Sequence, residues 1–138
     1  MKYKIAIVAS RFNDAHVNGL IDAALKLLKS HSVDIVRVPG AFEIPLAVQR
    51  VIRKKKPQAV IALGVIWRGK TLHAELLARS VTDALLRVSL EHDVPVIHQV
   101  LTVKNEKDAK ERCFGKLNRG KEAAEVALQM LAGETDHE

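Results

Sequence analysis

Short runs rich in β-branched residues alternate along this chain with longer segments of helical spacing, and this alternation limits the possible folds more than any other feature. Buried strands are expected at Tyr3–Ala9, Asp34–Val38, Ala59–Val65 and Val94–Leu101. Between them apolar residues recur at helical intervals, in Val17–Leu28, Pro45–Ile52, the stripe Leu77, Val81, Leu85 and Val88, a shorter piece around Asn105–Arg112, and Ala123–Leu131. Such alternation predicts an α/β fold in which helices cover both faces of a parallel sheet.

The length of the chain is that of one domain. Its 138 residues can bury a core of their own, so we expect a single domain, 1–138, with a disordered tail at 133–138. The single cysteine, Cys113, cannot form an internal disulfide, and the start of the chain lacks the apolar run of a signal peptide. These features favour a cytoplasmic protein. Because no segment approaches the roughly 20 apolar residues of a membrane span, no membrane contact is expected.

The formal net charge of +6 is compatible with nucleic-acid binding, with an anionic substrate or simply with a charged surface. The densest basic run, Arg53–Lys56, comes directly before Pro57, where cations suit the negative end of a helix dipole. Modules that stack nucleic-acid bases usually interleave aromatic and basic residues, yet this chain has only three phenylalanines, one tryptophan and one tyrosine. We therefore expect no nucleic-acid partner.

The loops after the predicted strands are the candidate binding sites, because ligands of open parallel sheets bind beyond the carboxyl ends of the strands. These loops are Ser10–Asn13, Val38–Pro45 and Gly64–His73. Phe12 and Phe42 fall in the first two. An aromatic residue at a strand end either plugs the core or offers a stacking surface to a planar heterocycle, and the sequence leaves both interpretations open.

The third loop matches the Walker A pattern, since Gly64 is followed after four residues by Gly69, Lys70 and Thr71. A phosphate-cradling loop needs small residues, whereas 65–68 read Val-Ile-Trp-Arg, and no later strand ends in the aspartate that would hold Mg²⁺. A P-loop-type nucleotide-binding protein is therefore the least favoured alternative. Gly69, Lys70 and Thr71 nevertheless open a predicted helix, whose free N–H groups favour a phosphate.

His73 lies in the first turn of that predicted helix, beside the proposed phosphate, where an imidazole can exchange protons with a substrate. The rest of the chain has no metal-ligand spacing, no glycine pattern for a dinucleotide and no nucleophile elbow. We expect neither a metal nor a cofactor. The groups that remain for chemistry are histidine, carboxylate, guanidinium and backbone groups, which suit proton transfer and the departure of phosphate.

Four motifs, in this order along the chain, resemble those of the lumazine synthase family. They are RFN at 11–13, VPGAFEIP at 38–45, RGKTLH at 68–73, and ER at 111–112 with KLNRG at 116–120. Together they cover nearly the whole chain. The resemblance implies a three-layer flavodoxin-like fold with a four-stranded parallel sheet in the order 2-1-3-4. It also implies a cofactor-free transferase of riboflavin biosynthesis, which condenses 5-amino-6-ribitylaminouracil with 3,4-dihydroxy-2-butanone 4-phosphate to 6,7-dimethyl-8-ribityllumazine, phosphate and water.

The resemblance further implies a role for each matched residue. Phe12 would stack on the pyrimidine, Ala41, Phe42 and Glu43 would meet the ribityl chain, and the backbone of Val65, Ile66 and Trp67 would contact the uracil edge. Gly69, Lys70, Thr71 and Arg112 would bind the phosphate, and His73 would act as the acid and base.

Three positions depart from the family pattern. His98 occupies a position that is usually aromatic and closes the pyrimidine pocket, Ala74 follows the histidine where aromatics are usual, and Trp67 replaces a common aliphatic residue. A non-catalytic relative that binds flavin or lumazine is therefore the first alternative. The family also implies a homo-oligomer with active sites between subunits. Because the chain starts close to its first strand, we expect a pentamer and not a shell of pentamers.

Overall fold

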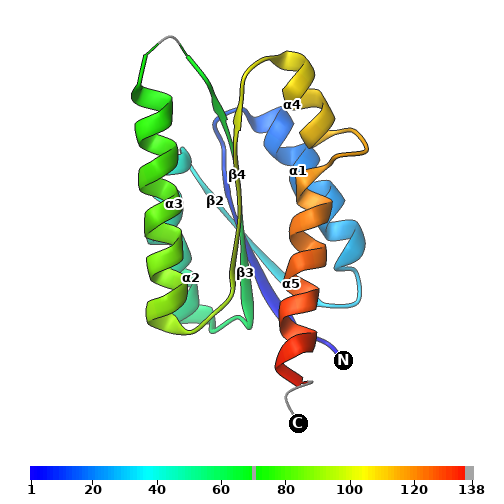
Figure 1. Cartoon of the computed structure of the whole chain (residues 1–138). Coiled ribbons are helices and arrows are strands. Elements are labelled where there is room, and N and C mark those ends of the chain that lie inside the picture. The colour runs from blue at the N-terminus through cyan, green and yellow to red at the C-terminus, as the bar shows by residue number, and fades with distance from the viewer. Residues whose placement is uncertain (70, 136–138) are drawn as a thin grey trace.

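The computed structural model describes residues 1–69 and 71–135, in which a parallel sheet lies between two layers of helices (Figure 1). The elements in chain order are β1 Lys4–Ser10, α1 Asp14–Leu27, β2 Ser32–Val38, the 3-10 turn η1 Ala41–Glu43, α2 Ile44–Lys55, β3 Ala59–Trp67, α3 His73–His92, β4 Val96–Val103, α4 Glu106–Cys113 and α5 Arg119–Thr135. The four strands are parallel in the order β2-β1-β3-β4. This order confirms the three-layer α/β fold and the strand order expected from the sequence.

The two central strands are the most buried part of the chain. Every residue of β1 after Lys4 is buried, and so is every residue of β3 before Trp67. The edge strands β2 and β4 are partly exposed, because each has a strand neighbour on one side only. Continuous apolar runs are typical of parallel strands covered by helices on both faces. The predicted strands are correct in number and place, with ends that differ by about two residues.

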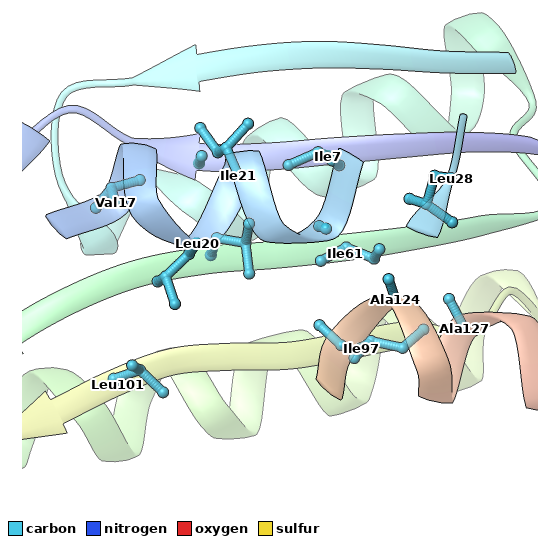
Figure 2. Packing of buried hydrophobic residues seen from close by; sticks show 14 of the residues in the cluster. Ile7, Val17, Leu20, Ile21, Leu28, Ile61, Ile97, Leu101, Ala124 and Ala127 are labelled. Carbon is cyan, nitrogen blue, oxygen red and sulfur yellow. The ribbon is translucent and has the colours of Figure 1, made fainter. Parts of the chain in front are cut away.

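Side chains that alternate along the strands form two separate cores. One face packs against α1 and α5, where Figure 2 shows Ile7, Ile61 and Ile97 of the sheet beside Leu20 of α1 and Ala124 of α5. The other face packs against α2 and α3, and its core includes the predicted stripe residues Val81, Leu85 and Val88. Each strand therefore contributes to both layers, as its period of two requires.

The predictions also concerned the ends of two helices, α2 and α5. The basic run closes α2 as expected, and Lys56 takes the left-handed conformation with its N–H donating to the Ile52 carbonyl at 3.1 Å. The helix α5 continues to Thr135 and so reaches into the segment 133–138 that was predicted to be a disordered tail. Burial of Leu131 anchors the last turns of this helix, and the cost of Gly133 in a helix is only about 1 kcal/mol. The remainder of the predicted tail, 136–138, lies outside the described residues.

Candidate functional site

The carboxyl ends of β1, β2 and β3 meet the first turns of α3 around a pocket of about 690 Å³. Its walls are formed by Phe12, Gly40, Ala41, Phe42, Glu43, Val65, Ile66, Trp67, His73, Ala74 and Leu77. The structure thus brings together His73 and all but one of the residues predicted to contact the pyrimidine and ribityl groups; the exception is His98. They converge because the strands are parallel, so that all carboxyl ends lie at the same edge of the sheet.

The two phenylalanines of the pocket are exposed and do not plug the core. The exposed fraction is 66% for Phe12 and 69% for Phe42. Because apolar aromatic surface is costly to leave in water, two such rings on one pocket indicate a surface that becomes covered. Of the two interpretations that the sequence left open, this exposure argues against a core plug and leaves both rings free to stack on a planar group.

The turn η1 presents one carboxylate to the pocket. Gly40 N–H donates to Glu43 Oε1 at 2.9 Å, and Glu43 N–H donates back to the Gly40 carbonyl at 3.2 Å. Ala41, between them, is buried against the core and anchors the turn. The Glu43 side chain is therefore held by one oxygen while it remains exposed at the pocket wall, where a carboxylate accepts hydrogen bonds from hydroxyl groups.

The end of β3 shows why the Walker-like pattern does not form a phosphate loop. Residues 65–67 remain extended and pair with Leu101, Thr102 and Val103 of β4. The next N–H group, that of Arg68, donates to the Val103 carbonyl at 2.8 Å. A phosphate loop needs successive N–H groups that turn inward toward the anion, and an extended strand points them alternately to its two sides. This geometry argues against the nucleotide-binding alternative.

His73 is the first residue of α3, as expected, and its side chain is exposed on the pocket wall. Its N–H group donates to Thr71 Oγ1 at 3.4 Å, and Leu72 at the N-cap position makes no side-chain hydrogen bond to the helix start. Gly69 and Thr71 are exposed on the loop before it. Lys70, predicted to bind phosphate, lies outside the described residues. The helix start therefore leaves backbone N–H groups available next to the imidazole.

Arg112 lies in a second hollow of about 300 Å³, lined by Arg68, Thr102, Lys104, Asp108 and Arg112. Arg112 Nε and Asp108 Oδ1 are 2.9 Å apart, and Arg68 forms an ion pair of 3.7 Å with Glu75 of α3. Within the described part of the chain this hollow gathers three cationic side chains around one lining carboxylate. Such an excess of positive charge suits an anion such as phosphate.

Comparison with known proteins assigns the chain to a family. The family described as 6,7-dimethyl-8-ribityllumazine synthase matches residues 2–134. The chain belongs to this family. The 6,7-dimethyl-8-ribityllumazine synthase of Thermococcus kodakarensis is 44% identical over 130 residues, which cover 92% of this chain and 83% of that protein. The corresponding protein of Halorhodospira halophila is 44% identical over 134 residues, covering 93% of this chain and 86% of that protein.

A structural comparison adds only the fold. Part of a cobalamin-dependent S-adenosylmethionine radical enzyme superposes with a TM-score of 0.52 at 12% identity, covering 96% of this chain and 19% of that chain. The lumazine synthase homologues are transferases of riboflavin biosynthesis, so the membership confirms the transferase predicted from the motifs. Across residues 1–69 and 71–135, no helix is long and apolar enough to cross a membrane.

His98 lies on the edge strand β4 and faces α3. Its Nε2 is 2.8 Å from Thr82 Oγ1, and its Nδ1 accepts the Val100 N–H at 3.1 Å. Because Nδ1 accepts a hydrogen bond from the backbone, the neutral ring carries its proton on Nε2. Burial lowers the pKa of His98 below its usual value of 6.5. Within a single chain, His98 is not among the residues that line the pocket of Phe12 and His73.

Neither a reactive cysteine nor a metal centre is found in the part of the chain that the structure describes. Cys113 is buried, and burial together with the nearby Glu106 carboxylate raises the pKa of its thiol to about 11. The thiol is therefore protonated near neutral pH and unreactive. No group of three His, Cys, Asp or Glu side chains among the described residues could hold a metal ion.

Sequence reasoning missed several residues of the two hollows. Gly40 and Leu77 line the pocket, and Arg68 and Lys104 join Arg112. Two signals were present: Arg68 opens the RGKTLH motif, and Lys104 directly follows the end of a strand, where ligand-binding residues of parallel sheets are found. Leu77 carried no such signal, because its apolar side chain also fits the core stripe of α3.

Proposed function

We propose that the pocket at the carboxyl edge of the sheet binds 5-amino-6-ribitylaminouracil and condenses it with 3,4-dihydroxy-2-butanone 4-phosphate, giving 6,7-dimethyl-8-ribityllumazine, phosphate and water without a cofactor. The observation that carries this proposal is the placement of His73 in one pocket with two exposed phenylalanine rings, in a chain that belongs to the lumazine synthase family.

The proposed pyrimidine site lies where the pairing between β1 and β3 ends. The strand β1 pairs with β3 only as far as Leu63, whereas β4 accompanies β3 to Trp67. Backbone groups of Val65 and Trp67 that face β1 therefore lie beyond the end of that ladder, and Asn13 Nδ2 donates to the Val65 carbonyl at 2.8 Å. In this proposal the remaining groups contact the uracil edge, while Phe12 stacks on the ring and Phe42 and Glu43 hold the ribityl chain.

The phosphate and proton-transfer roles belong to the start of α3 and to Arg112. Free N–H groups after Gly69, the Thr71 side chain and Lys70 bind the phosphate from one side, and Arg112 neutralises it from another. His73 moves the protons that imine formation, loss of phosphate and ring closure require. Holding both substrates in one orientation supplies a further part of the rate.

We infer that each site is completed by a neighbouring subunit of a pentamer. The pocket is open, with Phe12, Phe42 and the nearby Leu72 and Leu76 exposed at its rim. In the described chain, the pocket of His73 and the hollow of Arg112 share no lining residue. A neighbour that covers the exposed rim would exclude water and present its own Arg112 and His98 to this pocket. Light scattering should detect a particle of five 15.3 kDa chains; a monomer or a capsid-sized shell would contradict this inference.

The reaction itself is tested with purified protein and both substrates, by following the fluorescence of the lumazine product. His73→Ala should lower kcat by about 10²- to 10⁴-fold, as expected for loss of an acid–base group. His92→Gln is the matched control, because His92 ends the same helix far from the pocket. A wild-type protein that binds lumazine but forms none would instead be the non-catalytic relative, and one that hydrolyses a nucleotide would favour the P-loop alternative.

A further inference from the structure

We propose that Trp67 is a positioning residue, which holds the Phe12 loop in its ligand-binding conformation through a hydrogen bond to Asn13. The inference rests on the proposed function of the pocket and adds to it a residue that acts without touching the reacting atoms. It starts from a contact between residues 54 positions apart, in which Trp67 Nε1 donates to Asn13 Oδ1 at 2.8 Å.

Asn13 adopts a backbone conformation that needs support. Its φ of 62° and ψ of 47° lie in the left-handed region, which costs a non-glycine residue free energy. It occupies the N-cap position of α1, yet its side chain makes no capping hydrogen bond. An asparagine at this position ordinarily stabilises the helix by capping. Here the amide is directed away from the helix and toward β3.

Both ends of the Asn13 amide are engaged at the end of β3. The indole N–H of Trp67 can only donate, so the amide oxygen must face Trp67 and the amide nitrogen must face the Val65 carbonyl. The two hydrogen bonds therefore determine the orientation of the side chain as well as its position. A leucine or isoleucine at position 67 could not supply the donor, which makes this pair a property of the tryptophan.

The position of Asn13 determines that of Phe12, the preceding residue. On the other side, Arg11 N–H donates to the Val38 carbonyl at 2.7 Å and Phe12 N–H to the Pro39 carbonyl at 3.0 Å. The Phe12 ring is two-thirds exposed, so little side-chain packing holds it. The ring is therefore oriented before a ligand arrives by backbone contacts to the end of β2 on one side and by the two hydrogen bonds of the Asn13 side chain, called here the Asn13 clamp, on the other.

Trp67 is itself held by side chains outside the pocket. The His16 ring contacts it edge-on, with centroids 5.6 Å apart, and also lies 5.7 Å from the Phe114 ring. His16 Nε2 is 3.1 Å from Glu106 Oε1 at the start of α4. These residues belong to α1, α4 and the loop after α4, so the Trp67 side chain contacts this helix layer as well as lining the pocket.

The test is a double-mutant cycle on binding of the product, 6,7-dimethyl-8-ribityllumazine, measured by titration calorimetry. Trp67→Phe keeps an aromatic ring and removes only the hydrogen-bond donor. Asn13→Gly removes the Asn13 clamp, and glycine adopts the left-handed conformation without strain. We expect Trp67→Phe to raise Kd about three- to tenfold, the loss typical of one neutral hydrogen bond. In the Asn13→Gly background the same substitution should have no further effect, because Trp67 acts through Asn13. In steady-state assays Trp67→Phe should raise KM for the uracil substrate and leave kcat unchanged.

An unchanged Kd in Trp67→Phe, or an equal loss in both backgrounds, would overturn the inference while leaving the proposed function intact. Failure of the wild-type protein to bind lumazine would overturn the proposed function itself. If Trp67→Phe does not fold, Asn13→Gly alone decides, since it retains the tryptophan. It should weaken lumazine binding at least threefold, and unaltered binding would contradict the role of the clamp. The emission of Trp67, the single tryptophan of the chain, should change when lumazine binds to the wild-type protein.

Discussion

A Cβ atom on Gly120 would lie 2.0 Å from the carbonyl oxygen of Leu20, so α5 approaches the backbone of α1 more closely than any side chain permits. Asn118 supports this junction, since its amide oxygen accepts the Gly120 N–H at 2.8 Å and its amide nitrogen donates to the Cys113 carbonyl at 2.7 Å. The contact joins two helices that cover the same face of the sheet.

Gly120→Ala should therefore destabilise the protein, because the added methyl group can only be accommodated by moving backbone. We expect a loss of about 1–3 kcal/mol in the free energy of unfolding, measured by urea denaturation. Gly133→Ala in the same helix is the matched control, since a Cβ there meets nothing within 4 Å. It should stabilise the protein by up to about 1 kcal/mol. Equal effects of the two substitutions would show that the close approach does not limit position 120.

Arg112→Ala should weaken use of the phosphorylated substrate. Loss of a charge-assisted hydrogen bond to phosphate is worth about 1.5–3 kcal/mol, which is roughly a 10- to 150-fold fall in kcat/KM. Binding of the uracil substrate should change little. Arg53→Ala, which removes an exposed arginine in the last turn of α2, is the control and should leave the kinetics unaltered. Unchanged steady-state constants for Arg112→Ala would remove its role in phosphate binding.

Mixed assemblies test whether a site is shared between subunits. His73→Ala and Arg112→Ala subunits, each impaired when assembled alone, should recover part of the wild-type rate when they assemble together. Some interfaces would then pair an intact histidine with an intact arginine. In the control, His73→Ala subunits are assembled with subunits that carry both His73→Ala and Arg112→Ala. No interface then has an intact histidine, and no recovery is expected. If confirmed mixed particles stay inactive, both residues act within one chain.

The unfolding free energy should depend on pH through His98. Because the pKa of His98 is lowered in the folded state, the unfolded chain binds more protons below about pH 6.5, and the stability contributed by the neutral ring is lost as the pH falls. Protonation of Nδ1 would also remove its hydrogen bond from Val100. The stability advantage of the wild type over His98→Gln should therefore shrink between pH 8 and pH 5, as measured by denaturant titrations at each pH. An advantage that stays constant or grows toward low pH would contradict this assignment.

The sequence by itself determined the layers of the fold and the edge of the sheet where the pocket lies. Short β-branched runs indicate the strands, apolar spacings of three to four residues indicate the helices, and parallel strands must end at a common edge. Phe12, Glu43 and His73 could therefore be brought to one place from their positions after predicted strands. The order of the strands came from the family resemblance, because periodicity does not say which strands are neighbours.

Only the tertiary structure decided the contacts between residues far apart in the chain. The Trp67–Asn13 hydrogen bond, the close approach of Gly120 to Leu20, and the position of His98 against Thr82 depend on strand register, helix crossing and side-chain rotamer. The helical state of 133–135 likewise follows from burial of Leu131 in the core. The local sequence around one residue does not determine such a contact. Each contact forms only after the rest of the core has placed the two elements that meet there.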